Sequence, residues 1–410
     1  MKIETTEVRE IVDSRGVPTV EVTLGTSTHT VTASVPSGKS TGSKEAIEKR
    51  DDDGRGVNNV MRLLRDEVFP VLLSREFVDQ HALDTFLIEL DGTKNKARLG
   101  ANGMLAVSIA YAKLSAKQKS VPLWQHIAES ETFTPSYPRL YMNVMNGGAH
   151  ANFRLPFQEY IVVVGGIPSQ AYERAKDIFI TLGDVVHSAV GEVPMGDEGG
   201  YSPQFNTLER PFEILSELIH YEDEMFLAID AAATEFSENG NYTILGTTYT
   251  RAELIGTYRA LIEKFGLKSL EDPFAEHDVE GFSALLAGAQ KDIIVVGDDL
   301  TVTNSEVLKS MISVHAGNAL IVKPNQIGTL TEVYDTVRLA HSAGWKTIVS
   351  HRSGETEDSF IADLAVGVGA YGLKAGAPSQ RVRAVKYERL VAIEHERTSK
   401  FKNLCAMMTV

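Results

Sequence analysis

Cysteine is almost absent from this chain of 410 residues, because only Cys405 carries a thiol. A single thiol cannot form a disulfide within the chain or supply the thiolate cluster of a metal centre. Long apolar runs are absent too. The first residues, MKIETTEVRE, alternate charged and apolar side chains instead of forming the core of a signal peptide, and no segment approaches membrane-spanning length. We therefore expect a cytoplasmic protein that has no contact with membranes.

Positive charge is in deficit as well. The chain has 40 Lys and Arg against 55 Asp and Glu, which gives a formal net charge of -15. A nucleic-acid groove needs a basic stripe, so this balance argues against a nucleic-acid partner. If the substrate is an anion, the overall field repels it, and local cations must create its site.

The composition that remains is that of a globular protein, with 43% hydrophobic and 23% charged residues, in a chain long enough for two or three domains. Residues 5–36 alternate apolar and polar positions, which predicts an antiparallel hairpin around the turn GTST. From about Glu45 to Lys119 the pattern becomes helical, and the two parts form a small α+β unit. The Pro-containing linker at 132–140 divides the chain into an N-terminal α+β domain, 1–131, and a second domain, 132–410.

Short apolar segments alternate with helical segments through the second domain. Six of these segments end on a chemically functional residue: Asp230, Glu271, Asp298, Lys323, His351 and Lys374. From Glu271 onward the spacing is 23 to 28 residues, about the length of one strand and one helix. Repeated units of this kind predict an α/β fold with a parallel sheet, here closed into a TIM-type β/α barrel. The carboxyl ends of barrel strands meet at one mouth, so these six residues should face one another.

Three of the six residues are acids, and together they indicate a metal site. Asp230, Glu271 and Asp298 would place three carboxylates around one point, which requires a cation. Oxygen ligands without Cys or a pair of His favour magnesium over zinc or copper. A strand-end acid can instead cap the next helix, and the neighbouring Asp272 and Asp299 suit that structural task better.

Lys323 ends the strand pattern of ALIVKPNQIG. A single strand-end lysine is usually a solvated charge. Beside a metal and Lys374, however, the pKa of Lys323 would fall toward that of a general base. Such a base suits removal of a proton next to a carboxylate, with the metal stabilising the charge that develops, a pairing described for enzymes that use a Lys base with magnesium.

The segment VSHRSGETEDSF places Arg352 and Ser353 next to His351. A guanidinium and a hydroxyl are donors for phosphate or carboxylate, so an anionic substrate is expected. The alternative is that Arg352 pairs with Glu355 or Glu357.

SGKSTG, residues 37–42, resembles a phosphate-binding P-loop only superficially. Ala33 stands where that motif needs its first glycine, and Pro36 interrupts the loop, so a P-loop is excluded. The segment is either a plain turn or a lid that lends Ser40 to a metal. Two glycine-rich stretches, NVMNGGAHANFRLPFQEY and PMGDEGGYSP, carry His150, Glu159 and Glu198 and are weak signals when taken singly.

Read together and in order from about residue 2 to 396, these motifs resemble the enolase family of the enolase superfamily. The strings that carry the resemblance are DSRGVPTVEV, VPSGKSTG, LDGTKNKARLGAN, NVMNGGAHA, FQEY, GDEGG, LAIDAAATEF, SLEDPF, VGDDLTVTN, LIVKPNQIG, SHRSGETEDSFIADLAVG and LKAGAP. The resemblance implies an N-terminal α+β domain on a modified barrel that begins ββαα. It also implies a lyase that reversibly dehydrates 2-phospho-D-glycerate to phosphoenolpyruvate in glycolysis, with two Mg²⁺ per active site.

The resemblance also implies residue roles. Asp230, Glu271 and Asp298 hold the first metal, and Ser40 reaches the second. Lys323 becomes the base, and Glu198, positioned with Glu159, the acid for the departing hydroxyl. The other residues implied at the site are Lys374 for the substrate carboxylate, Arg352, Ser353 and His351 for the phosphate, and Gln158, Glu159 and the closing residue His150 in the pocket.

The chain departs from the family pattern at several positions. Val17 replaces an asparagine of DSRGNP, and Lys39 replaces an alanine in the lid loop. In the tail, Val382 and Ala392 replace a glutamate and an arginine that in the family pair with N-terminal residues across the dimer interface. Those partner positions are occupied here by Arg9 and Glu21, so both ion pairs are lost from the expected homodimer or higher oligomer.

Three alternatives remain at this point. A paralogue would act on a phosphonate or a related carboxylate analogue, although the intact SHRSGE and GDEGG strings argue against it. A structural or adhesive protein would show erosion of the strand-end residues. An acid-sugar dehydratase on the same barrel would not need the SGxSTG loop or the SHRS string.

Overall fold

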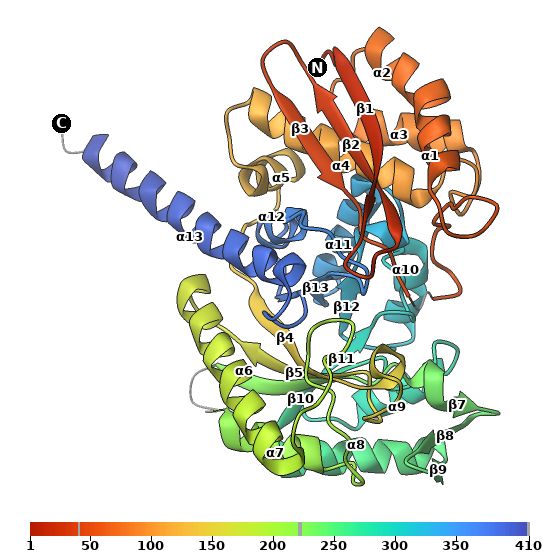
Figure 1. Ribbon diagram of the computed structural model, residues 1–410, viewed down its shortest axis with the longest axis vertical. Coiled ribbons are helices and arrows are strands. Elements are labelled where there is room, and N and C mark those ends of the chain that lie inside the picture. The colour runs from red at the N-terminus through yellow and green to blue at the C-terminus, as the bar shows by residue number, and fades with distance from the viewer. Residues whose placement is uncertain (40–41, 220–223, 408–410) are drawn as a thin grey trace.

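The computed structural model describes residues 1–39, 42–219 and 224–407 of the chain (Figure 1). Its N-terminal part is a three-stranded antiparallel sheet followed by helices. The strands are β1 (Thr5–Val12), β2 (Pro18–Gly25) and β3 (Thr30–Ser34), and the helices are α1 (Asn58–Leu63), the π-helical turn η1 (Leu64–Val68), α2 (Phe69–Ser74), α3 (Gln80–Asp91), α4 (Ala101–Gln118) and α5 (Leu123–Glu131). The predicted hairpin is β2–β3, and β1 adds a third strand in register with β2.

One face of this sheet is apolar and lies on α4. Val20, Val22 and Leu24 alternate along β2 with more polar residues, and all three are fully buried, as the period of two requires. The turn between β1 and β2 is held by the Asp13 carboxylate, which accepts hydrogen bonds from the backbone amides of Arg15 and Val17 at 2.8 and 3.0 Å. Val17 takes part in this hydrogen bond through its backbone amide, so the bond does not require the asparagine side chain of the family pattern.

The second part is a closed barrel of eight strands, which confirms the predicted fold. The strands are β4 (Arg139–Asn146), β5 (Glu159–Val164), β6 (Met225–Asp230), β10 (Leu267–Glu271), β11 (Ile294–Gly297), β12 (Ala319–Val322), β13 (Lys346–Ser350) and β14 (Gly372–Lys374). Strand β5 is antiparallel to both of its neighbours, β4 and β6, while the other pairs are parallel. Among the described residues, the helices α6 and α7 follow β5 before β6, so the barrel begins ββαα.

Helices surround the barrel strands (Figure 1). They are α6 (Pro168–Val190), α7 (Arg210–Leu218), α8 (Arg251–Phe265), α9 (Val279–Ala287), α10 (Ser305–Ser313), α11 (Leu330–Ser342), α12 (Phe360–Gly367) and α13 (Arg381–Met407), and a small sheet, β7 (Ser237–Glu238), β8 (Asn241–Ile244) and β9 (Thr247–Tyr249), precedes α8. Local sequence sets helix ends: α8 starts at a capping box between Thr250 and Glu253 and stops at Gly266, which has a left-handed φ of +64°.

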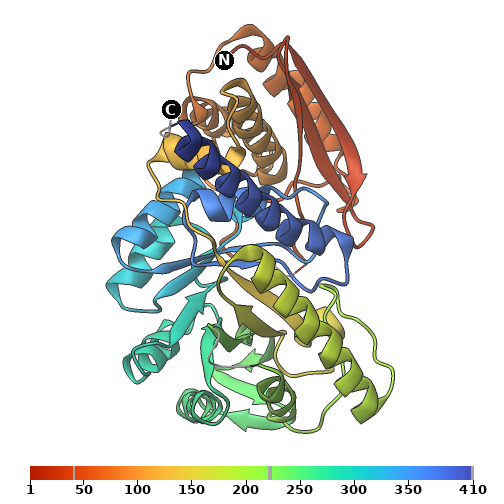
Figure 2. The ribbon, with the colours of Figure 1, turned by 90° about the vertical axis from the view of Figure 1, so that its left-hand side faces the viewer.

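Loops of the N-terminal part lie over the barrel mouth. Ser37 and Gly354 exchange backbone hydrogen bonds of 2.8 and 3.0 Å, and the Ala46 amide donates to the carbonyl of Gln326 at 2.8 Å. Figure 2 shows the N-terminal sheet above the barrel with α13 crossing between them. Both parts of the chain therefore contribute to whatever the mouth holds.

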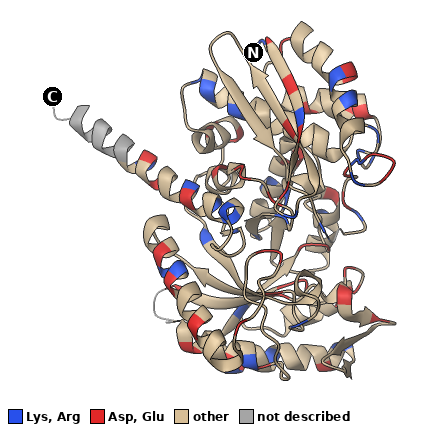
Figure 3. Ribbon diagram, viewed as in Figure 1, with Lys and Arg blue, Asp and Glu red and all other residues tan. Residues whose placement is uncertain are grey.

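Charged positions are interspersed along the helices of both parts (Figure 3). Within the described ranges, no helix combines the length and the apolar character that crossing a membrane would need.

Candidate active site

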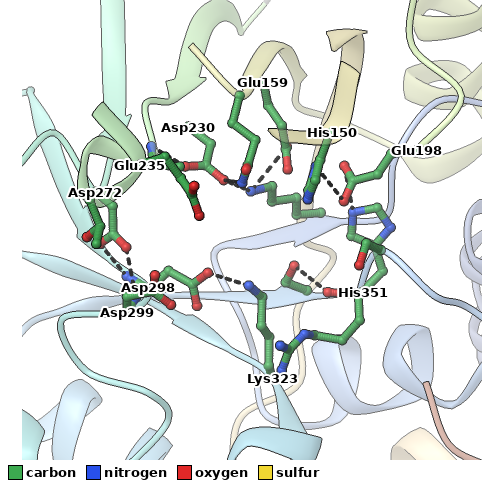
Figure 4. Close-up of a pocket in the computed structure, with 17 residues that line it drawn as sticks. His150, Glu159, Glu198, Asp230, Glu235, Asp272, Asp298, Asp299, Lys323 and His351 are labelled. Atoms are coloured by element: carbon green, nitrogen blue, oxygen red, sulfur yellow. Dashed lines mark hydrogen bonds and ion pairs between the residues drawn. The ribbon is translucent and has the colours of Figure 1, made fainter. Parts of the chain in front are cut away.

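The strand ends line a polar cavity at the carboxyl end of the barrel (Figure 4), with about 550 Å³ of empty space that includes its opening to solvent. Its lining is His150, Gln158, Glu159, Glu198, Asp230, Ala232, Thr234, Glu235, Asp272, Asp298, Asp299, Lys323, Ser350, His351, Arg352, Ser353 and Lys374. The structure therefore brings together, in one cavity, every site residue expected from the sequence except Glu271 and Ser40. Glu271 lies directly behind the lining, in contact with Lys374, and Ser40 lies outside the described residues.

Lys374 is the centre of a buried cluster of carboxylates. Its Nζ lies 2.7 Å from Glu271 Oε2, and 3.1 Å from both Asp230 Oδ2 and Glu159 Oε2. Burial would lower the pKa of Lys374, but Asp230 and the other carboxylates raise it well above its usual value. The ammonium therefore holds three carboxylates together at the ends of β5, β6, β10 and β14.

Lys323 faces this cluster from the end of β12. Its Nζ forms an ion pair with Asp298 Oδ2 (Figure 4). Burial would lower the pKa of Lys323, but the Asp298 carboxylate raises it, and Lys323 in turn lowers the pKa of Asp298 against the effect of burial. In the protein without ligands, Lys323 is therefore a protonated lysine with its own counter-ion.

Asp272 and Asp299 extend the acidic wall beside Asp298. The Asp272 carboxylate accepts hydrogen bonds from the backbone amides of Asp298 at 2.9 Å and Asp299 at 2.8 Å, so it shapes the turn after β11. The prediction that Asp272 and Asp299 cap the following helices is wrong, because Asp278 caps α9 and Asn304 caps α10. Asp272 instead holds this turn. Burial raises the pKa of Asp299 to about 7, with a further contribution from Asp298.

On the opposite side, Glu159 and Glu198 form an acid pair with His150. Atoms of all three side chains lie within 4.8 Å of one another. Burial raises the pKa of Glu159 well above its usual value, and the charge of Glu198 raises it further. Burial also acts to raise the pKa of Glu198, but His351 and His150 beside it lower that pKa overall. Of the two carboxyls, Glu159 therefore holds a proton more tightly than Glu198 in the ligand-free protein.

Arg383, a fully buried residue of α13, determines the tautomer of His351. Arg383 Nη1 donates to His351 Nδ1 at 2.5 Å, which leaves Nε2 to carry the ring proton toward Glu198 Oε2, 3.4 Å away. Burial lowers the pKa of His351 to about 4, so the ring is neutral near pH 7. Arg383 also donates to the carbonyls of Arg352 and Ser353, and it thereby shapes the whole 351–353 segment.

Arg352 is held from the N-terminal part of the chain. The Glu45 carboxylate accepts from its Nη1 at 2.9 Å and its Nη2 at 3.2 Å. The sequence also allowed an ion pair between the guanidinium and Glu355. Glu355 instead accepts a hydrogen bond from the backbone amide of Arg352 and forms an ion pair with Lys386 at 2.9 Å. Arg352 therefore keeps its guanidinium on the cavity wall.

Lys39 does not face the carboxylates of the barrel. Its Nζ donates to Asp197 Oδ2 at 2.7 Å and to the Ala149 carbonyl at 3.1 Å. Lys39 therefore connects residues 37–39 to the loops that carry His150 and Glu198.

Several residues around the site were not found from the sequence. Asn143 donates to Glu198 Oε2 at 2.9 Å, Glu45 holds Arg352, and Arg383 orients His351. Asn143 had a readable signal, because it is a polar residue in the middle of RLYMNVMN, a strand that is otherwise buried and largely apolar. Glu45 and Arg383 had none, since their partners lie 307 and 32 residues away along the chain.

The donor set fits a hard divalent cation. Carboxylates outnumber cations in the cavity, and burial, followed by the charge of Asp230, raises the pKa of Glu271 well above its usual value. In the part of the chain that is described, Glu271 Oε1 is buried without a hydrogen-bond partner. An all-oxygen ligand set with an unsatisfied carboxylate oxygen is the environment that Mg²⁺ prefers.

Comparison with known proteins covers both parts of the chain. The model of the enolase C-terminal TIM barrel domain matches residues 135–406, and that of the enolase N-terminal domain matches residues 3–127. An enolase of Methanocaldococcus jannaschii is 42% identical over 400 residues, which span 95% of this chain and 94% of the relative. An enolase of Methanopyrus kandleri is 41% identical over 96% of both chains, and one of Acidothermus cellulolyticus is 41% identical over 96% of this chain and 94% of the relative.

Proposed function

The chain belongs to the enolase family, and from that premise we propose how its residues carry out the reversible dehydration of 2-phospho-D-glycerate to phosphoenolpyruvate. The protein is thus a lyase, a phosphopyruvate hydratase. The curated relatives are named enolases, which does not favour a phosphonate-processing paralogue. The observation that carries the residue assignment is the meeting of two lysines and three strand-end carboxylates across one barrel mouth.

Lys323 is the base in this proposal. Its Nζ takes the proton from C2 of 2-phosphoglycerate, and the electron pair of the broken C–H bond moves onto the substrate carboxylate to give an enolate. Lys323 must first lose its own proton, and its ion pair with Asp298 opposes that loss in the ligand-free protein. Asp298 must therefore be engaged elsewhere when Lys323 acts.

Asp230, Glu271 and Asp298 would hold one Mg²⁺ ion, and we propose a second ion in the same site, with Ser40 among its ligands. When bound, magnesium stabilises the negative charge that develops on the substrate carboxylate. Lys374, which lies among these carboxylates and lines the cavity, contacts the substrate carboxylate. Its ammonium adds a fixed positive charge where the enolate forms.

Glu198 and Glu159 carry out the second half of the reaction. The C3 hydroxyl leaves as water with a proton from the acid pair, and the enolate electrons form the C2–C3 double bond. Glu198 is the proposed donor. Because Glu198 holds a proton less tightly than Glu159 in the ligand-free protein, Glu198 must acquire its proton before or during this step. His150, 3.6 Å from Glu198 Oε1, closes this side of the pocket.

The phosphate would lie on the wall formed by the 351–353 segment, with donors from Arg352, Ser353 and His351. All three side chains are buried. Arg383 holds His351 in place, and Glu45 holds Arg352. Gln158 Nε2 donates to Asp230 Oδ2 at 3.4 Å and completes the opposite wall.

We further propose a homodimer that acts in the cytoplasm, and a division of the chain into domains 1–131 and 132–410. The division is supported by the end of α5 at Glu131 and the start of β4 at Arg139. The single cysteine, Cys405, accords with a reducing compartment.

The experiment is to follow phosphoenolpyruvate formation from 2-phosphoglycerate by ultraviolet absorbance. We expect turnover with Mg²⁺, loss of turnover with a chelator and recovery when Mg²⁺ is restored. Lys323→Ala should lower kcat about 10²–10⁴-fold, as removal of a general base does. Lys268→Ala, which removes a half-buried lysine of β10 that pairs with Asp292 away from the cavity lining, is the matched control and should retain activity. A folded wild type without turnover in Mg²⁺ would overturn the assignment.

A further inference from the structure

The turn after Lys323 contains two amide side chains to which the proposed reaction gives no task. The 3-10 turn η5 (Pro324–Gln326) begins directly after the proposed base. Gln326 is only 1% exposed. Its Nε2 donates to Asp298 Oδ1 at 3.0 Å and to Glu45 Oε1 at 3.3 Å, and its Oε1 accepts from the Thr303 hydroxyl at 2.7 Å. Every polar atom of this buried amide is thus engaged.

The orientation of the Gln326 amide follows from its partners. Asp298 and Glu45 offer carboxylate oxygens, which accept hydrogen bonds when ionised, so the NH₂ group must face them. The Thr303 hydroxyl oxygen already accepts the backbone N–H of Lys323 at 2.9 Å, and its own hydrogen is therefore available to Gln326 Oε1. One continuous chain of hydrogen bonds runs from the backbone of the base to the carboxylate of Asp298.

Thr303 reaches this position through an unfavourable backbone conformation. Val302 and Thr303 have φ of +45° and +52°, although both are β-branched. Left-handed backbone at such residues is strained and persists only where the surroundings fix it. The strain places the Thr303 hydroxyl between β12 and Gln326, which is where the hydrogen-bond chain needs it.

We propose that Gln326 is a positioning residue that orients the Asp298 carboxylate for the metal, and that Thr303 fixes Gln326 in turn. The inference rests on the proposed function, in which Asp298 is a metal ligand. Asp298 Oδ2 pairs with Lys323, so the hydrogen bond from Gln326 to Oδ1 determines the rotation of the whole carboxylate. Second partners of this kind set the affinity of a ligand group for its metal.

Asn325 provides the internal contrast. It belongs to the same turn, but its Oδ1 accepts from Arg352 Nη1 at 3.1 Å and thus serves the phosphate wall. Adjacent amides of one turn are therefore divided between the two halves of the site: Gln326 supports the metal ligand, and Asn325 supports the anion-binding arginine.

The test is calorimetric titration of the full-length, substrate-free protein with Mg²⁺ alone and, separately, with inorganic phosphate in the presence of Mg²⁺. Gln326→Leu should weaken Mg²⁺ binding about 10–100-fold, the range found when a second partner of a ligand is lost. Asn325→Leu should bind Mg²⁺ as the wild type does and weaken phosphate binding. Unchanged Mg²⁺ affinity in a folded Gln326→Leu variant would overturn the inference.

Two further variants separate the possible failures. Asp298→Asn should lose Mg²⁺ binding; if it does not, the proposed ligand set is wrong, and the inference falls with it. If Asp298→Asn loses binding but Gln326→Leu keeps it, the inference alone is wrong. Should Gln326→Leu fail to fold, Thr303→Val and Thr303→Ser replace it: the serine keeps the hydroxyl and should restore the affinity that the valine loses, and equal affinities would contradict the proposal.

Discussion

At the scale of single residues, Asn143 shows how a polar group inside a strand serves the acid pair. Its Nδ2 donates to Glu198 Oε2, while its Oδ1 is buried without a partner among the described residues. Replacement by leucine removes a hydrogen bond to a charged group, worth about 1.5–3 kcal/mol, and also removes the unsatisfied oxygen. We therefore expect Asn143→Leu to lower kcat about tenfold or more, with little change in KM or in the urea midpoint of unfolding.

Steady-state kinetics and urea titration of the same preparation check this expectation. If a folded Asn143→Leu variant kept the wild-type kcat, the contact with Glu198 would have no part in the reaction.

Also at the residue scale, the sequence predicted those groups whose position follows from the strand pattern. Lys323 and Asp298 stand directly after β12 and β11, and Lys374 ends β14, because strand periodicity and unit length place them there. The supporting residues were not predictable in this way. Glu45 meets Arg352 only because the N-terminal loop folds onto the barrel, and no local pattern encodes a contact between such distant segments.

At the scale of elements, helix α11 is capped by a side chain from the N-terminal part. The buried Asp84 of α3 accepts from the backbone amide and the hydroxyl of Thr331, both at 2.8 Å, and from Ser108 and Gln80. Thr329, the residue just before α11, caps the same helix end by accepting from the backbone amide of Glu332. The predicted elements of the barrel were found in order, but this inter-element cap could not be read from either helix alone.

Asp84 makes the stability of this junction depend on pH. Burial raises the pKa of Asp84 to about 6 from its usual 3.8. The folded state therefore binds the Asp84 proton more tightly than the unfolded chain does. This proton binding stabilises the fold fully below pH 3.8, and the stabilisation is lost as the pH rises through about 6. A shift of about two pKa units corresponds to about 3 kcal/mol.

Measured against Asp84→Asn, the free energy of unfolding of the wild type should fall by an amount of this order between about pH 4 and pH 7. Urea titrations at a series of pH values give the difference. A difference that does not vary with pH, or that rises with pH, would show that Asp84 is ionised in the fold without penalty.

At the scale of the whole molecule, the departures at Val382 and Ala392 bear on how two copies associate. The family pattern pairs charges at these positions with residues 9 and 21 of the partner. In this chain Arg9 and Glu21 are opposite each other on β1 and β2 and form an ion pair within the chain. Val382 lines one groove with Glu21 and with Val12, a valine that is 63% exposed. In the proposed dimer, Val382 and Val12 would therefore offer apolar contact in place of the two ion pairs, within a groove whose other lining is mostly polar or charged.

Salt distinguishes these two kinds of interface. Ion pairs across an interface weaken as ions screen them, whereas apolar contact does not weaken in this way. We expect the dimer fraction, measured by sedimentation velocity, to stay constant or rise as NaCl increases from about 0.05 M to about 0.5 M. Val382→Glu places an acid where it can draw Arg9 of the partner subunit away from Glu21, so this variant should dissociate as salt increases. Dissociation of the wild-type dimer by salt would contradict this expectation. Positions 382 and 392 are Val and Ala and carry no charge to pair with Arg9 or Glu21, so other charges would then have to hold the two copies together.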